Sequence, residues 1–230
     1  MARNSLSFVC QQCGAVSPKW AGKCDDCGAW NTLVEERKEA PSGPGKRVTG
    51  RQIVLEALNL NDRPEPPPRM QSGISEFDRV SGGGLVPGSA TLIGGDPGIG
   101  KSTLLLQLTC KLAAVGLKAA YISGEESADQ VRMRAQRLGL ANAGVELGTA
   151  TNASDIAASM DGPAEPYIMV IDSIQTMFLP SLDSAPGTVS QVRATAQELI
   201  RAAKKNQVAL LIVGHVTKDG AIAGPRVLEH

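Results

Sequence analysis

The sequence predicts an α/β fold in which a mainly parallel sheet is flanked by helices, and three observations carry this prediction. From residue 89, apolar runs alternate with stretches of helical periodicity, as in a parallel sheet with helical crossovers. Residues 95–102 read Gly-Asp-Pro-Gly-Ile-Gly-Lys-Ser and fit the phosphate-binding pattern G-x-x-x-x-G-K-S/T at every fixed position. The hydrophobic fraction of 42% can form a core, which the aromatic fraction of 3% makes aliphatic.

The expected elements follow this alternation in order. Ser127 with Gln130, and Thr188 with Gln191, have the spacing of a capping box, which predicts two helix starts. Strands are predicted at residues 89–94, 118–123, 145–148, 167–172 and 207–214, and helices at 101–115, 127–138, 153–160 and 188–205.

The phosphate-binding pattern predicts a site for ATP or ADP with Mg²⁺. Its glycines let successive backbone N–H groups point at phosphate oxygens, and the helix start adds a partial positive charge. Lys101 would reach the β- and γ-phosphates, and the Ser102 hydroxyl would hold Mg²⁺. A glycine-rich turn before an ordinary helix is the weaker alternative, given the strand and helix on either side. The predicted nucleotide contacts are Gly95, Asp96, Pro97, Gly98, Ile99, Gly100, Lys101, Ser102 and Thr103.

Polar residues follow three of the other predicted strands. Asp172 is the last residue of an apolar run. Ligands bind beyond the carboxyl ends of parallel strands, so we expect Asp172 to orient Mg²⁺ and to lie among the residues that contact the nucleotide. Glu125 and Glu126 follow another strand, where a carboxylate can take the proton of an attacking water. The residues alone leave open which glutamate does this and which complements the next helix start. His215 is either a γ-phosphate contact or a buried, hydrogen-bonded histidine.

Two C-x-x-C-G sequences near the N-terminus predict a zinc ribbon. A two-residue gap lets both sulfurs reach one metal, and four thiolates suit tetrahedral Zn²⁺. Two disulfides and a redox C-x-x-C pair are alternatives. Disulfides are rare in the cytosol, where we expect a nucleotide-binding chain to be, and the presence of two matched C-x-x-C copies favours a metal site over a redox pair. The four predicted ligands are Cys10, Cys13, Cys24 and Cys27.

Other residues near these motifs are expected to be structural. Trp20 and Trp30 flank the cysteine pairs and are predicted to supply most of the small core of the ribbon. The fifth cysteine, Cys110, lies on the apolar side of the helix after the phosphate loop and is predicted to be a core residue.

Three regions are predicted along the chain. They are a four-cysteine ribbon at 1–36, a linker with a proline-rich connector at 37–70, and the nucleotide-binding core at 71–230, where Ser75 is expected to cap a short helix over 76–80. The formal net charge is zero, although residues 188–230 carry six bases against three acids, which is a weak sign of a nucleic-acid face. No apolar run is long enough to span a membrane and no signal peptide is evident, so we expect a cytoplasmic protein without a membrane partner.

Together these motifs resemble the RadA (Sms) family of bacterial DNA-repair proteins, within the RecA/DnaB-like ATPases. The resemblance runs over nearly all 230 residues. It rests on the CQQCG and CDDCG sequences of the ribbon and on residues 72–80, 82–84, 94–103, 121–127 and 170–176.

The resemblance implies a RecA-like core that forms hexameric rings on single-stranded DNA. It implies a DNA-stimulated ATPase that drives branch migration during homologous recombination, acts on single-stranded and branched DNA, and works beside recombinase or replication proteins. By position, it makes Glu125 the catalytic glutamate, with Lys101 as its catalytic partner, and His215 the polar sensor. Residues 218–226 and 177–187 would be DNA-facing loops.

The family continues past the equivalent of Glu229-His230 with further strands, a Lys-Asn-Arg-Phe-Gly motif and a Lon-protease-like domain. We therefore expect a fragment with an incomplete core that binds nucleotide, turns it over slowly and migrates no branches. Strong DNA-stimulated hydrolysis would contradict this expectation.

Two other functions share this core. One is a signalling ATPase or autokinase of the KaiC type, which phosphoprotein formation would favour, and which the ribbon argues against. The other is a zinc-ribbon adaptor whose core only switches with nucleotide, which the intact set of Lys101, Ser102, Glu125 and Asp172 argues against.

Removing zinc is predicted to unfold residues 7–36 and to leave the nucleotide-binding core folded, because all four ligands come from the ribbon and no ligand position stays open for chemistry. Both tryptophans of the chain lie in the ribbon, so tryptophan fluorescence during a chelator titration measures this. An unchanged signal would contradict it.

Overall fold

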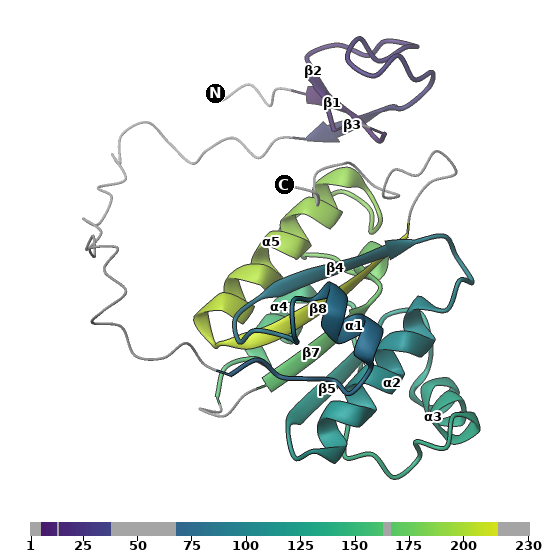
Figure 1. The fold of residues 1–230 in the computed structure, drawn as a ribbon. Coiled ribbons are helices and arrows are strands. Elements are labelled where there is room, and N and C mark those ends of the chain that lie inside the picture. The colour runs from purple at the N-terminus through teal and green to yellow at the C-terminus, as the bar shows by residue number, and fades with distance from the viewer. Residues whose placement is uncertain (1–5, 13, 38–67, 163–166, 216–230) are drawn as a thin grey trace, which may run out of the picture.

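The computed structural model describes residues 6–12, 14–37, 68–162 and 167–215, and it confirms the α/β prediction. Five parallel strands form one sheet in the order β4-β8-β7-β5-β6 (Figure 1). The strands are β4 (Ala90–Gly95), β5 (Lys118–Ser123), β6 (Glu146–Thr149), β7 (Tyr167–Asp172) and β8 (Val208–His215). The helices are α1 (Ser75–Val80), α2 (Lys101–Ala114), α3 (Ala128–Arg137), α4 (Ala153–Ala158) and α5 (Val189–Lys205), with a 3-10 turn, η2, at Ile174–Thr176.

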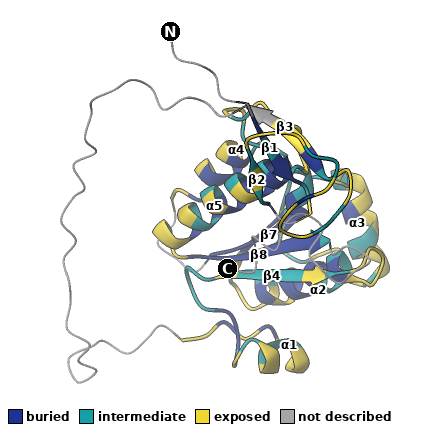
Figure 2. Ribbon diagram, turned by 90° about the horizontal axis from the view of Figure 1, so that it is seen from above, coloured by how far each residue is buried: buried dark blue, intermediate teal, exposed yellow. Residues whose placement is uncertain are grey.

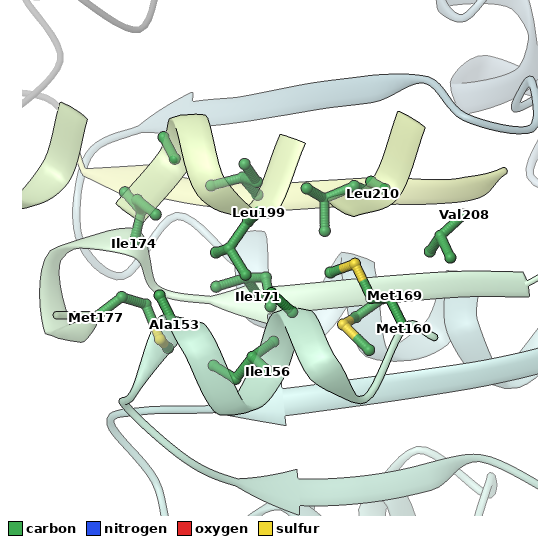
Figure 3. Packing of buried hydrophobic residues seen from close by; sticks show 14 of the residues in the cluster. Ala153, Ile156, Met160, Met169, Ile171, Ile174, Met177, Leu199, Val208 and Leu210 are labelled. Atoms are coloured by element: carbon green, nitrogen blue, oxygen red, sulfur yellow. The ribbon is translucent and has the colours of Figure 1, made fainter. Parts of the chain in front are cut away.

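Helices cover both faces of this sheet, and the alternation of side chains along β7 shows how. Tyr167, Met169 and Ile171 pack into a cluster with residues of α4 and α5, part of which Figure 3 shows. Ile168 and Val170 point the other way, into a cluster with α2 and α3. Every residue of β7 is buried, and in Figure 2 exposure is concentrated on the outer sides of the helices. A strand buried on both faces is apolar along almost all of its length, which is why the sequence of residues 167–171 clearly predicted a central strand.

The helix starts agree with the sequence in one case and differ in two. Ser127 and Gln130 form the predicted capping box at α3. Ser75 is the first residue of α1, not its cap. Thr188 makes no side-chain cap at α5. The side-chain amide of Gln191 instead forms hydrogen bonds with the backbone of Leu179, Leu182 and Ser184. This buried side chain thereby pairs backbone N–H and C=O groups of a loop that is not part of a strand.

The N-terminal module is a three-stranded antiparallel sheet, β2-β1-β3, of β1 (Leu6–Cys10), β2 (Val16–Ser17) and β3 (Leu33–Arg37). Its two cysteine turns match: Gly14 N–H donates to Cys10 O at 2.8 Å, and Gly28 N–H donates to Cys24 O at 2.9 Å. Both glycines have positive φ, 77° and 73°, as the tight turns require.

The prediction that tryptophans form the core of the ribbon was wrong. Trp20 is 61% exposed and Trp30 is 71% exposed, and the buried cluster of the module contains Cys10, Cys24 and Leu33. The two cysteines and Leu33, with Phe8 packed against them, occupy the interior of the module instead of the indole rings. Tryptophan fluorescence therefore reports the surroundings of two rings at the surface. Both rings lie next to Gly22: a Cβ atom built there would be 3.9 Å from Trp30 Cζ3 and 4.0 Å from Trp20 Cη2.

The ribbon also contacts the core. The side-chain oxygen of Gln11, in the first cysteine turn, accepts a hydrogen bond from the backbone N–H of Val189 at 3.1 Å. Val189 is the first residue of α5, where a helix leaves its N–H groups without intrahelical partners. Among the described residues, no helix is long and apolar enough to cross a membrane.

Gly124 closes the turn after β5 and leaves no room for a side chain. A Cβ atom there would overlap Thr176 Oγ1 and lie 2.9 Å from Met177 Cε. Thr176 Oγ1 donates to Ser173 O at 2.8 Å and Met177 is fully buried, so neither neighbour can move cheaply.

We predict that Gly124→Ala lowers the free energy of unfolding by about 1–3 kcal/mol, as for other overpacked sites. Chemical denaturation measures this. Gly144→Ala is the matched control: nothing lies within 4 Å of its Cβ position, and the substitution should leave stability unchanged or raise it by about 0.4–1 kcal/mol. Equal effects of the two substitutions would contradict the steric argument.

Candidate nucleotide site and cysteine cluster

The phosphate loop connects β4 to α2, as predicted. Gly98 and Gly100 have positive φ, 81° and 98°, and Gly100 occupies the N-cap position of α2 without a side-chain cap. Among the described residues, no side chain caps the first N–H groups of this helix, which suits an anion. The loop folds closely over Gly95, where a Cβ atom would overlap Ile99 Cδ1.

Lys101 lies under this loop and is 7% exposed. Its Nζ donates to the backbone oxygens of Gly95 and Asp96, at 2.7 and 2.8 Å. The ammonium is therefore held at the base of the loop by the backbone that would surround the phosphates.

Four neighbouring strands bring the predicted residues to one edge of the sheet. Gly95 at the end of β4 pairs with His215 at the end of β8, and Ser123 at the end of β5 pairs with Asp172 at the end of β7. The N–H of Gly124 donates to Asp172 O at 2.8 Å, which fixes the start of the Glu125 turn beside β7. The parallel register alone thus gathers the loop, His215, Asp172 and the glutamates.

Glu125 is held by two neighbours. The Ser173 hydroxyl donates a short hydrogen bond to Glu125 Oε1, and His215 Nε2 lies 3.0 Å from the same oxygen. Partial burial acts to raise the pKa of Glu125, but these two hydrogen bonds and the charges of His215 and Lys101 outweigh it and lower the pKa below its ordinary value. Glu125 therefore stays ionised, with Lys101 close enough to act on its charge.

Glu126 has different surroundings. Its carboxylate forms an ion pair with Arg134 of α3, whose side chain is 15% exposed, and its backbone N–H donates to Ser123 Oγ at 2.9 Å. The two adjacent glutamates thus divide: Glu125 contacts His215 at the edge of the sheet, and Glu126 ties the turn to α3.

Asp172 is 4% exposed, and the hydroxyl of the fully buried Tyr121 donates a short hydrogen bond to its Oδ2. Burial, followed by the charge of Asp172 and the hydrogen bond to it, raises the pKa of Tyr121 strongly, so the phenol keeps its proton. Carboxylate oxygen is a preferred ligand type for Mg²⁺, directly or through water, so the residues present suit that ion.

Sequence reasoning missed three residues of this region. Ser173 stands next to Asp172, and its position at a strand end was the available signal. Tyr121 and Arg134 lie in a strand and a helix whose sequences read as ordinary structure, so nothing local marked them. Residues 218–226 lie outside the described residues. The other predicted loop, 177–187, is held by Gln191 and carries Asp183 but no lysine or arginine.

The cysteines of the ribbon gather as predicted, as far as the structure describes them. The sulfurs of Cys10, Cys24 and Cys27 all lie within 4.8 Å of one another, and the Cys10 and Cys27 sulfurs are 3.6 Å apart. Cys13 lies outside the described residues. Three thiols converging from two matched turns suit tetrahedral coordination of zinc. Cys110, a residue of α2, is buried in the core, as expected.

Solved structures with the same fold place the core in a known class. One is an ATPase domain, with a TM-score of 0.57 at 15% identity over 66% of this chain and 65% of its own. Another is a DnaB-like replicative helicase, solved to describe its interactions with primase, with a TM-score of 0.57 at 14% identity over 66% of this chain and 44% of its own. The core is therefore a RecA/DnaB-like P-loop fold.

The AAA domain family matches residues 62–221, so the chain belongs to that family, and a rubredoxin metal-binding domain matches residues 8–35, which supports Zn²⁺ at the cysteine cluster. Over its whole length the chain is similar to the DNA repair protein RadA of Brucella abortus and of Pseudomonas aeruginosa, each at 53% identity, and of Bacillus subtilis at 46%. The resemblance seen in the sequence is thereby confirmed. The chain spans about half the length of these relatives, 51% of each.

We predict that Ser173→Ala raises the pKa of Glu125, because burial then acts with one opposing hydrogen bond fewer. A ¹³C NMR titration of the side-chain carboxyl groups measures it. Ser159→Ala is the control, since that hydroxyl bonds the backbone oxygen of Asp155 and should leave the titration of Glu125 unmoved. No upward movement in Ser173→Ala would contradict the assigned cause.

Proposed function

We propose that this chain is the nucleotide-hydrolysing part of a DNA-repair ATPase, which couples ATP hydrolysis to movement on single-stranded DNA and to branch migration. The observation that carries the proposal is the meeting of a phosphate loop, Asp172 and an ionised Glu125 at one edge of the sheet. The relatives named DNA repair protein RadA support the DNA-repair role.

Lys101 and the α2 start would receive the phosphates. Two of the three N–H groups of the Lys101 ammonium donate to backbone oxygens, so the third would be left to donate to a phosphate oxygen.

Asp172 and the Ser102 hydroxyl would hold Mg²⁺. The ion, when bound, would neutralise the negative charge that develops on the phosphate oxygens. Asp172 contributes a carboxylate fixed by its strand and by Tyr121, so it need not be ordered when the metal arrives.

Glu125 would take the proton from the attacking water. It must be ionised to do so, and the hydrogen bonds from Ser173 and His215 favour that state. His215 touches Glu125 and is paired in register with Gly95, so it lies between the base and the phosphate loop. This supports a role for His215 in relaying the state of the phosphates to the residues that follow β8.

DNA stimulation, ring assembly and cytoplasmic location complete the proposal. The family resemblance supports assembly into a ring, and the excess of basic residues after 188 supports contact with a nucleic-acid phosphate backbone. The loop at 177–187 has no lysine or arginine side chain. The positive charge that neutralises the DNA phosphates would therefore have to come from elsewhere in the chain.

The adjacent glutamates supply a matched test. Lys101→Ala should abolish ATP binding. Glu125→Gln should keep binding and lower the hydrolysis rate by about 10²–10⁴-fold, as for loss of a general base. Glu126→Gln should keep both, since Glu126 pairs with Arg134.

Binding by fluorescence anisotropy and hydrolysis by phosphate release measure these outcomes, with thermal unfolding to check that each variant folds. Hydrolysis by Glu125→Gln at the wild-type rate would refute the assignment. Transfer of labelled phosphate onto the protein would favour the autokinase function instead.

A further inference from the structure

Tyr121 and Asp172 lie on neighbouring strands and on the same face of the sheet. Tyr121 pairs with Val170 and Ser123 pairs with Asp172, so the tyrosine and the aspartate are diagonal neighbours across the β5–β7 ladder. Tyr121 and Val170 both pack into the cluster that contains α2 and α3, and side chains two residues apart share a face. That face carries α2, the helix that begins at the phosphate loop.

The phenol is well placed to orient the carboxylate. Tyr121 is fully buried and Asp172 is 4% exposed, so water has little access to either group. A buried carboxylate is costly unless it accepts hydrogen bonds, and the Tyr121 hydroxyl donates to Oδ2. The donor occupies one carboxylate oxygen, which fixes the direction in which Oδ1 points.

We propose that Tyr121 is a positioning residue for Mg²⁺: its hydroxyl fixes the Asp172 carboxylate in the orientation that receives the hydrated ion. This inference rests on the proposed function, because it requires Asp172 to orient the Mg²⁺ of a bound nucleotide. Partners behind a metal-binding carboxylate orient it, and their loss lowers metal affinity or activity by about 10- to 100-fold in known sites.

A second tyrosine provides the matched control. Tyr167 opens β7, is 7% exposed, and interacts through its hydroxyl with Glu146. Tyr121→Phe and Tyr167→Phe therefore each remove one oxygen from a buried ring in adjacent strands. Only the first removes a donor from Asp172.

The experiment compares the affinity of a non-hydrolysable ATP analogue with Mg²⁺ present and with Mg²⁺ omitted, by calorimetry on the whole chain. No chelator is used, because it would compete for metal at the cysteine cluster. In Tyr121→Phe, the gain in affinity that Mg²⁺ gives should fall by about 10- to 100-fold, with the Mg²⁺-free affinity unchanged. Tyr167→Phe should keep the full gain. The electron paramagnetic resonance spectrum of bound Mn²⁺ should change in Tyr121→Phe alone.

Three results would overturn the inference. One is a full Mg²⁺-dependent gain in Tyr121→Phe, and another is an equal loss of affinity with and without Mg²⁺, which a merely structural tyrosine would give. The third concerns Asp172→Asn, which should abolish the Mg²⁺-dependent gain. If adding Tyr121→Phe to Asp172→Asn lowers the affinity for the ATP analogue still further, the tyrosine acts independently of Asp172. Absence of the gain in the wild-type chain would instead refute the proposed function together with this inference.

Stability offers a separate measurement. If Tyr121→Phe unfolds at a lower temperature because Asp172 has lost its donor, then adding Asp172→Asn should restore the midpoint, since the unpaired buried charge is gone. Failure of this rescue in a destabilised Tyr121→Phe would also overturn the inference.

Discussion

The site depends on one constraint: β7 must be apolar on both faces and still end in a carboxylate. Every residue of this strand is buried, Asp172 included. Burial of the apolar residues holds β7 between β5 and β8, and that order decides which strand ends become neighbours. The charged group is tolerated because it lies at the last position of the strand and accepts a hydrogen bond from Tyr121.

The three acidic groups of this edge differ because their partners differ. Asp172 has a neutral donor, Glu126 has a cation, and Glu125 has a hydroxyl and an imidazole. All three are within three residues of a strand end, so distance along the chain does not separate their surroundings. Their surroundings differ because β8 supplies His215, α3 supplies Arg134 and the turn after β7 supplies Ser173.

Much of the core could be predicted from the sequence because its signals are local. The strand at residues 167–172 and the phosphate loop are each set by their own residue types, and the structure has them within a residue of the expected bounds. The different surroundings of Glu125 and Glu126 could not be predicted from these residues alone, since they depend on His215, 90 residues along the chain, and on the way α3 turns Arg134 back toward Glu126. The tryptophan prediction failed for a different reason: cysteine side chains and Leu33 fill the interior of the ribbon, and hydrophobicity alone does not show which residues will do so.

The hydrogen bonds from Lys101 to its own loop affect how a measured change in nucleotide affinity should be interpreted. A lysine with two backbone acceptors at 2.7 and 2.8 Å is already desolvated and partnered before any ligand arrives. Its removal changes the free energy of the empty protein as well as that of the complex. The effect of a Lys101 substitution on binding is then a difference between two perturbed states, and it does not by itself measure the intrinsic attraction between this ammonium and a phosphate.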